Sequence, residues 1–370
     1  MFSHKKNYFN PSNHVLKRAN PVFYIVSISH FLITYFAYKF INLYSGDAKN
    51  YWFITKSKED FINSTPIPLR EDLLYYINYI FTNNLNLPFW FGFLIYSCVG
   101  LLGIWILYKT TLKLNSSIQY KWIYIPLLLL PSIHFWTSMI GKEPICFLGI
   151  SLVFYSLITT KVKTTPILIG FILLALVRPH VGIILAFSVI LSFLIKNKKI
   201  SISYFLMFIT FSGASLYFLL KSHWLENFSL DNLQFLFQKH HEVLKTTDTY
   251  VPLEEYNIFY KVFTFYFRPL PFEINNLWGW ISGIENLFSL FIFTIGLYSI
   301  FQLIRKRKYA LSKLDISIII FFITLAGVFS LAYSNFGLIA RMKNQSLPFM
   351  LMLCIYWIGL YFNQKKHGKT

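Results

Sequence analysis

Stretches of apolar residues recur along the whole chain and are separated by short polar segments. Several approach the ~20 residues that a helix needs to cross a bilayer, so the pattern predicts an all-α polytopic membrane protein. We expect about ten transmembrane helices in a single transmembrane domain over residues 1–370. The expected spans are 22–44, 89–108, 122–139, 144–160, 165–177, 181–195, 202–220, 285–304, 316–333 and 346–362.

The charged residues predict the orientation of these spans. If both termini are cytoplasmic, the connections on that side hold 20 of the 34 basic residues, as the positive-inside rule requires. Of the 15 acidic residues, only Asp315 lies there. The net charge of +19 therefore indicates anchoring beside anionic lipid, and we expect no nucleic-acid binding. The cytoplasmic basic residues are Lys5, Lys6, Lys17, Arg18, Lys109, Lys113, Lys121, Lys161, Lys163, Lys196, Lys198, Lys199, Arg305 to Lys308, Lys313, Lys365, Lys366 and Lys369.

The segment 165–195 interrupts an apolar stretch with the motif "VRPH" at 177–180. Lysines flank the segment on both sides, so a hairpin is needed to keep both lysine clusters in the cytoplasm. Each arm is then shorter than the ~30 Å hydrocarbon core, and Arg178 and His180 are expected at a recessed tip where Pro179 helps to turn the chain. Irregular backbone at this depth predicts a cavity open to the outside.

Two long connections are expected on the outer side. The first extracytoplasmic loop covers 45–88, and a large extracytoplasmic loop covers 221–284. Both mix aromatic and charged residues in short amphipathic runs such as "EDLLYYINYIF" at 71–81, a pattern that favours interfacial helices on the membrane surface.

The polar motifs of the chain all fall on this outer side. They are "SGDAKNYW" (45–52), "SMIGKEP" (138–144), "VRPH" (177–180), "FYFRPLPFEINNLW" (265–278), "GIENLF" (283–288) and "NFGLIARMKNQSLP" (335–348). Several buried cations near the outer leaflet suggest an acidic or phosphorylated ligand that neutralises them, because arginine forms charge-assisted, often bidentate bonds to phosphate. A nearby carboxylate could then act as a base.

Each of these residues also has a structural interpretation. Asp47 is suited to cap an interfacial helix, and Arg178 to extend outward from a hairpin tip. Lys142 and Glu143 are adjacent, so on a helix their side chains point to different sides and one of them is expected at the surface.

The later motifs raise the same alternatives. Arg268 and Glu273 could pair with each other and brace the large loop. Glu285 lies inside an expected span and needs a partner, for which Arg341 is a candidate. For His134, core packing with a hydrogen bond is the favoured interpretation. No cofactor is indicated: the adjacent histidines of "KHHEV" (239–243) are poorly spaced to chelate on a helix, so a divalent metal stays possible without support.

The arrangement resembles the GT-C class of multi-span glycosyltransferases, in which an acidic residue with a nearby aromatic follows the first span. Here these positions are Asp47 and Tyr51 in "GDAKNYW". The layout is also similar to uncharacterised membrane proteins of bacterial polysaccharide clusters, whose motifs "FWTSMIGKE", "VRPH", "FRPLPFE" and "NFGLIARMK" match in order. The resemblance implies a GT-C-like fold and a multi-pass protein of the bacterial inner membrane.

The resemblance implies a membrane glycosyltransferase in cell-surface polysaccharide assembly. Its donor would be a sugar on a polyprenyl phosphate or diphosphate, its acceptor a glycan or a lipid-linked molecule, and membrane lipid would surround it. Preorganised cations stabilise a leaving phosphate. Asp47 is then the expected catalytic base. Glu143 is the second candidate for the base, or binds sugar hydroxyls instead. The expected substrate-binding residues are Tyr51, Lys142, Arg178, His180, Arg268, Glu273 and Arg341.

Other functions stay open. A Wzy-type oligosaccharide polymerase or ligase uses related lipid-linked sugars, although this sequence lacks the repeated arginine motifs in large outer loops that are typical of such polymerases. A transporter or flippase would need polar residues near the middle of the membrane and commonly shows inverted repeats, of which we find none. A structural partner in an export complex is a further alternative.

Overall fold

The computed structural model describes residues 21–44, 46–54, 57, 60, 69–114, 121–158, 164–196, 242, 244–247 and 249–367. These residues form helices, turns and irregular loops, apart from an isolated bridge between Tyr250 and Asn335. Six helices are long and apolar enough to cross a membrane. They are α1 (Pro21–Tyr44), α5 (Phe89–Leu114), α10 (Pro179–Lys196), α14 (Leu277–Arg305), α15 (Lys313–Ala332) and α17 (Leu347–His367).

These six helices confirm the prediction of an all-α, multi-pass membrane protein. Shorter apolar helices add α8 (Glu143–Leu157), α9 (Thr164–Val177) and α13 (Ile258–Phe267). Ten spans and two cytoplasmic termini stay predictions. The expected span 202–220 and most of the large loop before residue 242 lie outside the described residues, as does most of the "KHHEV" motif.

The expected continuous span 122–139 is wrong. The structure has a short 3-10 turn, η4 (Lys121–Tyr124), then α6 (Ile125–Leu128), and a new helix, α7 (Pro131–Thr137). Pro131 lacks the backbone N–H that a continuing helix would need, and proline disfavours the helical conformation at the preceding residue. Leu130 accordingly has an extended ψ of 122°.

The expected start of the span 285–304 is also wrong, because α14 begins eight residues earlier, at Leu277. The side chain of Asn276 caps the helix by accepting a hydrogen bond of 2.8 Å from the N–H of Gly279. Glu285 therefore lies inside a long helix rather than at its first residue.

The break at "VRPH" is confirmed: α9 ends at Val177 and α10 begins at Pro179. The preceding helix, α8, packs closely against α9 through small residues. A Cβ atom at Gly149 would lie 2.9 Å from the carbonyl oxygen of Gly170, and a Cβ at Gly170 would lie 2.6 Å from that of Gly149. Such close approach between apolar helices requires glycine at both positions.

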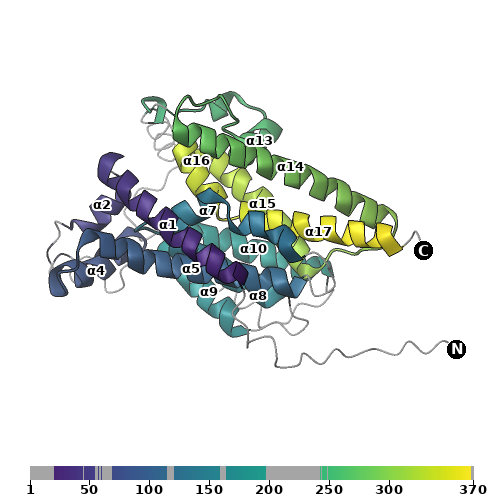
Figure 1. Cartoon of the computed structure of the whole chain (residues 1–370), viewed down its shortest axis with the longest axis horizontal. Helices are drawn as coiled ribbons and strands as arrows, with labels where there is room; N and C mark the ends of the chain where they lie inside the picture. Colours follow the sequence, from purple (N-terminus) through teal and green to yellow (C-terminus); the bar gives the residue numbers. More distant parts are fainter. Residues whose placement is uncertain are drawn as a thin grey trace, which may run out of the picture.

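Helices form one elongated bundle in which α5, α8 and α9 pack side by side, α10 packs on α15, and α14 packs on α17. Figure 1 shows α2 (Asp47–Trp52) and α4 (Glu71–Tyr79) together at the left end of the bundle, and the C-terminal ends of α14 and α17 at the right end. The two helices α2 and α4 confirm that the first loop contains short helices. Helix α16 (Phe336–Lys343) joins α15 to α17 near the first of these ends.

Candidate functional site

Four chain segments supply the charged residues at this end of the bundle. Asp47 is the first residue of α2, Glu143 is the first of α8, Arg178 lies between α9 and α10, and Arg341 is in α16. Glu143 and Arg178 each precede a proline, which is favoured in the first turn of a helix and disfavours helical backbone before it. The sequence thus places both side chains at helix ends.

Glu143 binds two guanidinium groups at once. Arg178 donates to its Oε1 through Nη2, and Arg341 donates to Oε1 through Nε and to Oε2 through Nη2, at 3.1 Å for the last contact. Arg178 also directs Nη1 at the sulfur of Met342 in α16. One carboxylate therefore holds α8, the α9–α10 break and α16 together.

Asp47 joins this cluster through Arg341. Its Oδ2 accepts a hydrogen bond of 2.7 Å from Nη1 of Arg341, across 294 positions of sequence. The cluster of Asp47, Glu143, Arg178 and Arg341 is called the charged cluster below. It contains the two expected catalytic residues, Asp47 and Glu143, and two of the expected substrate-binding residues, Arg178 and Arg341. Asp47 is linked to Arg178 through Arg341 and Glu143.

Burial is graded along the charged cluster. The side chains of Glu143 and Arg178 are 6% and 7% exposed, Arg341 is 15% exposed, and Asp47 is 58% exposed. An unpaired charge at the buried end would be strongly unfavourable, and Glu143 supplies the partner for both guanidiniums. The cations for which we expected a ligand as the counterion are thus balanced by the chain's own carboxylates, two guanidiniums against two carboxylates.

A second ion pair borders the charged cluster. Lys142 binds a different group from Glu143 and donates a hydrogen bond of 2.8 Å to Glu71 at the start of α4. The expectation that one of the two lies at the surface is wrong, because the side chains of Lys142 and Glu143 are only 11% and 6% exposed. Partial burial raises the pKa of Glu71, but Lys142, Arg70 and Arg341 outweigh it and hold this pKa below its usual range. Burial in turn lowers the pKa of Lys142, and its bond to Glu71 offsets only part of the effect.

Tyr51 lies beside these carboxylates but is only 5% exposed, and its ring packs on Tyr75 at 5.5 Å between centroids. Burial raises the pKa of Tyr51, and the negative charges of Glu71 and Asp47 raise it further, so its phenol stays protonated. His180, in the first turn of α10, is half-buried with its ring against Phe329 at 5.6 Å. Contact of either residue with a substrate stays a prediction.

Arg268 and Glu273 bind each other, as their structural interpretation expected. Nε of Arg268 donates to Oε1 of Glu273 at 2.8 Å, and Oε2 of Glu273 also accepts from the N–H of Leu270 at 2.7 Å. The guanidinium lies 5.5 Å from the ring centroid of Phe336, the first residue of α16. This pair therefore braces the loop before α14 against the helix that carries Arg341.

Arg341 is not the partner of Glu285, and that expectation is wrong because α16 directs Arg341 toward Glu143 instead. Glu285 accepts hydrogen bonds from the backbone N–H and the hydroxyl of Ser132 in α7. Lys343, two residues after Arg341 in α16, is 3% exposed and donates a hydrogen bond to the side chain of Asn286 in α14. These contacts are inside the bundle and tie α7, α14 and α16 together.

His134 confirms its expected role as a hydrogen-bonded core residue. Its Nδ1 lies 3.0 Å from Nδ1 of His30 in α1, and its Nε2 lies 2.8 Å from the carbonyl oxygen of Leu128. Sequence reasoning missed His30 as a partner, and it also missed Glu71 and Ser132. The one available signal was the acidic pair that begins the amphipathic run 71–81.

The described part of the chain contains no group of three or more His, Cys, Asp or Glu side chains arranged to hold a metal ion. What the charged cluster offers chemically is an exposed carboxylate bound to one guanidinium group, with a second guanidinium held behind it by a buried carboxylate. Comparisons of the chain with protein-family models, with curated proteins and with solved structures gave no match.

Proposed function

We propose that this chain is an integral membrane glycosyltransferase. Its donor is a sugar on a polyprenyl phosphate or diphosphate, and the reaction takes place at the extracytoplasmic face during cell-surface polysaccharide assembly. The observation that carries the proposal is the charged cluster, in which Asp47, Glu143, Arg178 and Arg341 come from four distant segments of the chain to one end of an apolar bundle.

The acid–base chemistry fits this assignment. An incoming sugar hydroxyl must lose a proton as it attacks, and Asp47 is the exposed carboxylate of the charged cluster. Its bond to Arg341 fixes the carboxylate in position, as a base that acts on one hydroxyl requires. Asp47 is therefore the proposed base.

The cations suit the leaving group. As the glycosidic bond breaks, negative charge grows on the phosphate, and preorganised donors in a poorly hydrated site stabilise that charge strongly. Arg178 and Arg341 retain N–H groups beyond those that bind Glu143. Glu143, held between the two guanidiniums, positions them, and this supports a positioning role for it in place of the second base expected from the sequence.

The test uses the purified full-length protein in vesicles that contain a panel of undecaprenyl-phosphate and undecaprenyl-diphosphate sugars with glycan acceptors. The proposal predicts release of the undecaprenyl phosphate or diphosphate together with a glycosylated acceptor. Transfer of an oligosaccharide onto a second lipid-linked chain would favour the polymerase alternative. Movement of the intact donor across the membrane, without cleavage of the glycosidic bond, would contradict the proposal and favour a flippase.

A further inference from the structure

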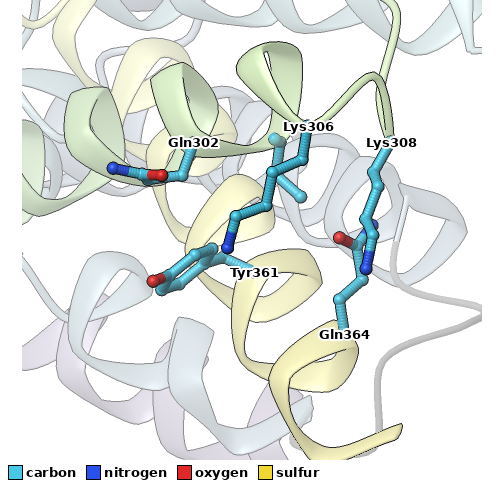
Figure 2. A pocket seen from close by; sticks show the side chains of 6 residues that line it. Gln302, Lys306, Lys308, Tyr361 and Gln364 are labelled. Atoms are coloured by element: carbon cyan, nitrogen blue, oxygen red, sulfur yellow. The ribbon is translucent and has the colours of Figure 1, made fainter. Parts of the chain in front are cut away.

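A hollow lies at the opposite end of the bundle from the charged cluster, between the C-terminal ends of α14 and α17. Figure 2 shows Lys306, directly after the end of α14, reaching toward the ring of Tyr361 in α17, with Gln302 above that ring and Lys308 above Gln364. We propose that this hollow binds the phosphate headgroup of an anionic phospholipid. The inference does not depend on the proposed glycosyl transfer. The lining residues are Gln302, Leu303, Lys306, Lys308, Tyr361 and Gln364.

The backbone that ends α14 positions both lysines at the hollow. The N–H of Lys308 donates to the carbonyl of Leu303 at 2.9 Å, and the N–H of Arg307 donates to that of Ile304 at 2.9 Å. Arg307 is in the left-handed region with φ 55°, so the turn has the hydrogen bonds and the conformation of a Schellman cap. This turn folds the chain back, and Lys306 and Lys308 both extend toward α17 (Figure 2).

The lining has the chemistry of a phosphate site. Two ammonium groups, two carboxamides and a phenol supply hydrogen-bond donors, and no carboxylate is among the lining residues. Lys306 lies 5.9 Å from the ring centroid of Tyr361, and the described residues give neither lysine a salt bridge. Backbone N–H groups already bind the carbonyls of Gln302, Leu303 and Ile304 in the last turn of α14, so these carbonyls do not need the ammonium groups as caps.

The surroundings favour a lipid over a soluble anion. Apolar side chains on α14 beside the hollow face outward: Phe301 is 61% exposed and Ile304 is 47% exposed, and on α17 Phe362 is 54% exposed. Both helices are long and apolar enough to cross the membrane, so their ends lie near its surface. A ligand with an anionic head over the hollow and acyl chains along these side chains fits both features.

The predicted orientation agrees with this ligand. The positive-inside pattern puts the end of α14 at the cytoplasmic surface, where anionic lipids concentrate and basic pockets between transmembrane helices bind their headgroups.

The experiment measures binding of phosphatidylglycerol to the full-length protein in neutral detergent by native mass spectrometry. Lys306→Gln and Lys308→Gln should each weaken binding about fivefold, since a cation near an anionic headgroup contributes about 1 kcal/mol. Arg307→Gly removes the same charge from outside the lining and relieves the left-handed backbone, so it should change binding less than twofold. Gln302→Leu, which leaves the charge unchanged, should also weaken binding.

Three outcomes would overturn the proposal. If Arg307→Gly and Lys308→Gln weakened phosphatidylglycerol binding equally, a diffuse electrostatic attraction rather than a defined site would account for the binding. Equal binding of phosphatidylcholine and phosphatidylglycerol would show that the hollow does not select an anionic headgroup. Displacement of the lipid by millimolar inorganic phosphate would identify a soluble phosphate site instead.

Discussion

Glu143 is the residue on which the charged cluster depends, because it is a buried carboxylate bound by two guanidiniums. Removal of one partner from a buried pair costs about 3–5 kcal/mol, since the other charge is left uncompensated. The sequence predicted that Glu143, Arg178 and Asp47 lie on the same side of the membrane, because all three begin or end segments that are expected to face outward. It did not predict Arg341 as the link between them, since a cation in a short helix can point to several sides.

The pair of Glu71 and Lys142 should make α4 sensitive to acid. The folded-state pKa of Glu71 lies below its usual value of 4.5, so the pair's contribution to stability is present above that value and is lost as the pH falls through the folded pKa. Hydrogen exchange of the backbone amides of α4 should therefore rise, beyond the intrinsic pH effect, below pH 4.5.

The matched variants for this prediction are Glu71→Gln and Glu255→Gln. Glu71→Gln should show faster hydrogen exchange in α4 already at neutral pH, with no further increase on acidification. Glu255→Gln, on the exposed turn before α13, should behave as the unmodified protein. An acid step that persists in Glu71→Gln would assign the effect to another group.

At the scale of elements, the contact between α8 and α9 sets the position of the charged cluster. Helix α8 begins with Glu143 and α9 ends one residue before Arg178, so any separation of the two helices moves both ends of their ion pair. The close approach at Gly149 and Gly170 keeps the helices together.

Gly170→Ala should therefore destabilise the protein, by about 1–3 kcal/mol, because the added Cβ overlaps the carbonyl of Gly149. Gly327→Ala is the control, since no atom lies within 4 Å of a Cβ at that position of α15. It should be neutral or stabilise the helix by up to about 1 kcal/mol. Thermal unfolding in detergent measures the stability of both variants. Equal effects of the two substitutions would contradict the claim that close packing of α8 on α9 requires glycine at position 170.

The proline positions explain which elements were predictable. The break at Arg178 was foreseen because Pro179 coincides with a change in polarity and with flanking lysines. The break at Pro131 was missed because the residues on both sides of it are apolar, so hydropathy alone reads 122–139 as continuous. The early start of α14 was missed because Gly279, Ser282, Gly283 and Glu285 lower the hydropathy of its first turns, whereas the cap at Asn276 begins the helix before them.

The whole molecule has two chemically different ends. The charged cluster lies with α2, α4 and α16 at one end, and the basic hollow lies with the ends of α14 and α17 at the other (Figure 1). Hydropathy and charge asymmetry in the sequence predicted this division. The pairing of helices, such as α10 with α15, was not predictable, because apolar surfaces of similar composition do not specify their partners.

Cysteine labelling tests this arrangement across the membrane. In a variant that lacks the exposed Cys98, Glu255→Cys should react with an impermeant maleimide from outside intact cells, and Arg305→Cys should react only after permeabilisation. Glu255 precedes α14 in the chain, Arg305 is the last residue of α14, and α14 is long enough to span the bilayer. Labelling of both from the same side would contradict the predicted topology.

The most direct test of the charged cluster as a catalytic site is the rate of undecaprenyl phosphate release by Asp47→Asn. Loss of a general base costs about 10²–10⁴-fold in rate, so the variant should lose at least about a hundredfold while it inserts and unfolds like the unmodified protein. Glu255→Gln should keep full activity. Release by Asp47→Asn at the unmodified rate would contradict the account.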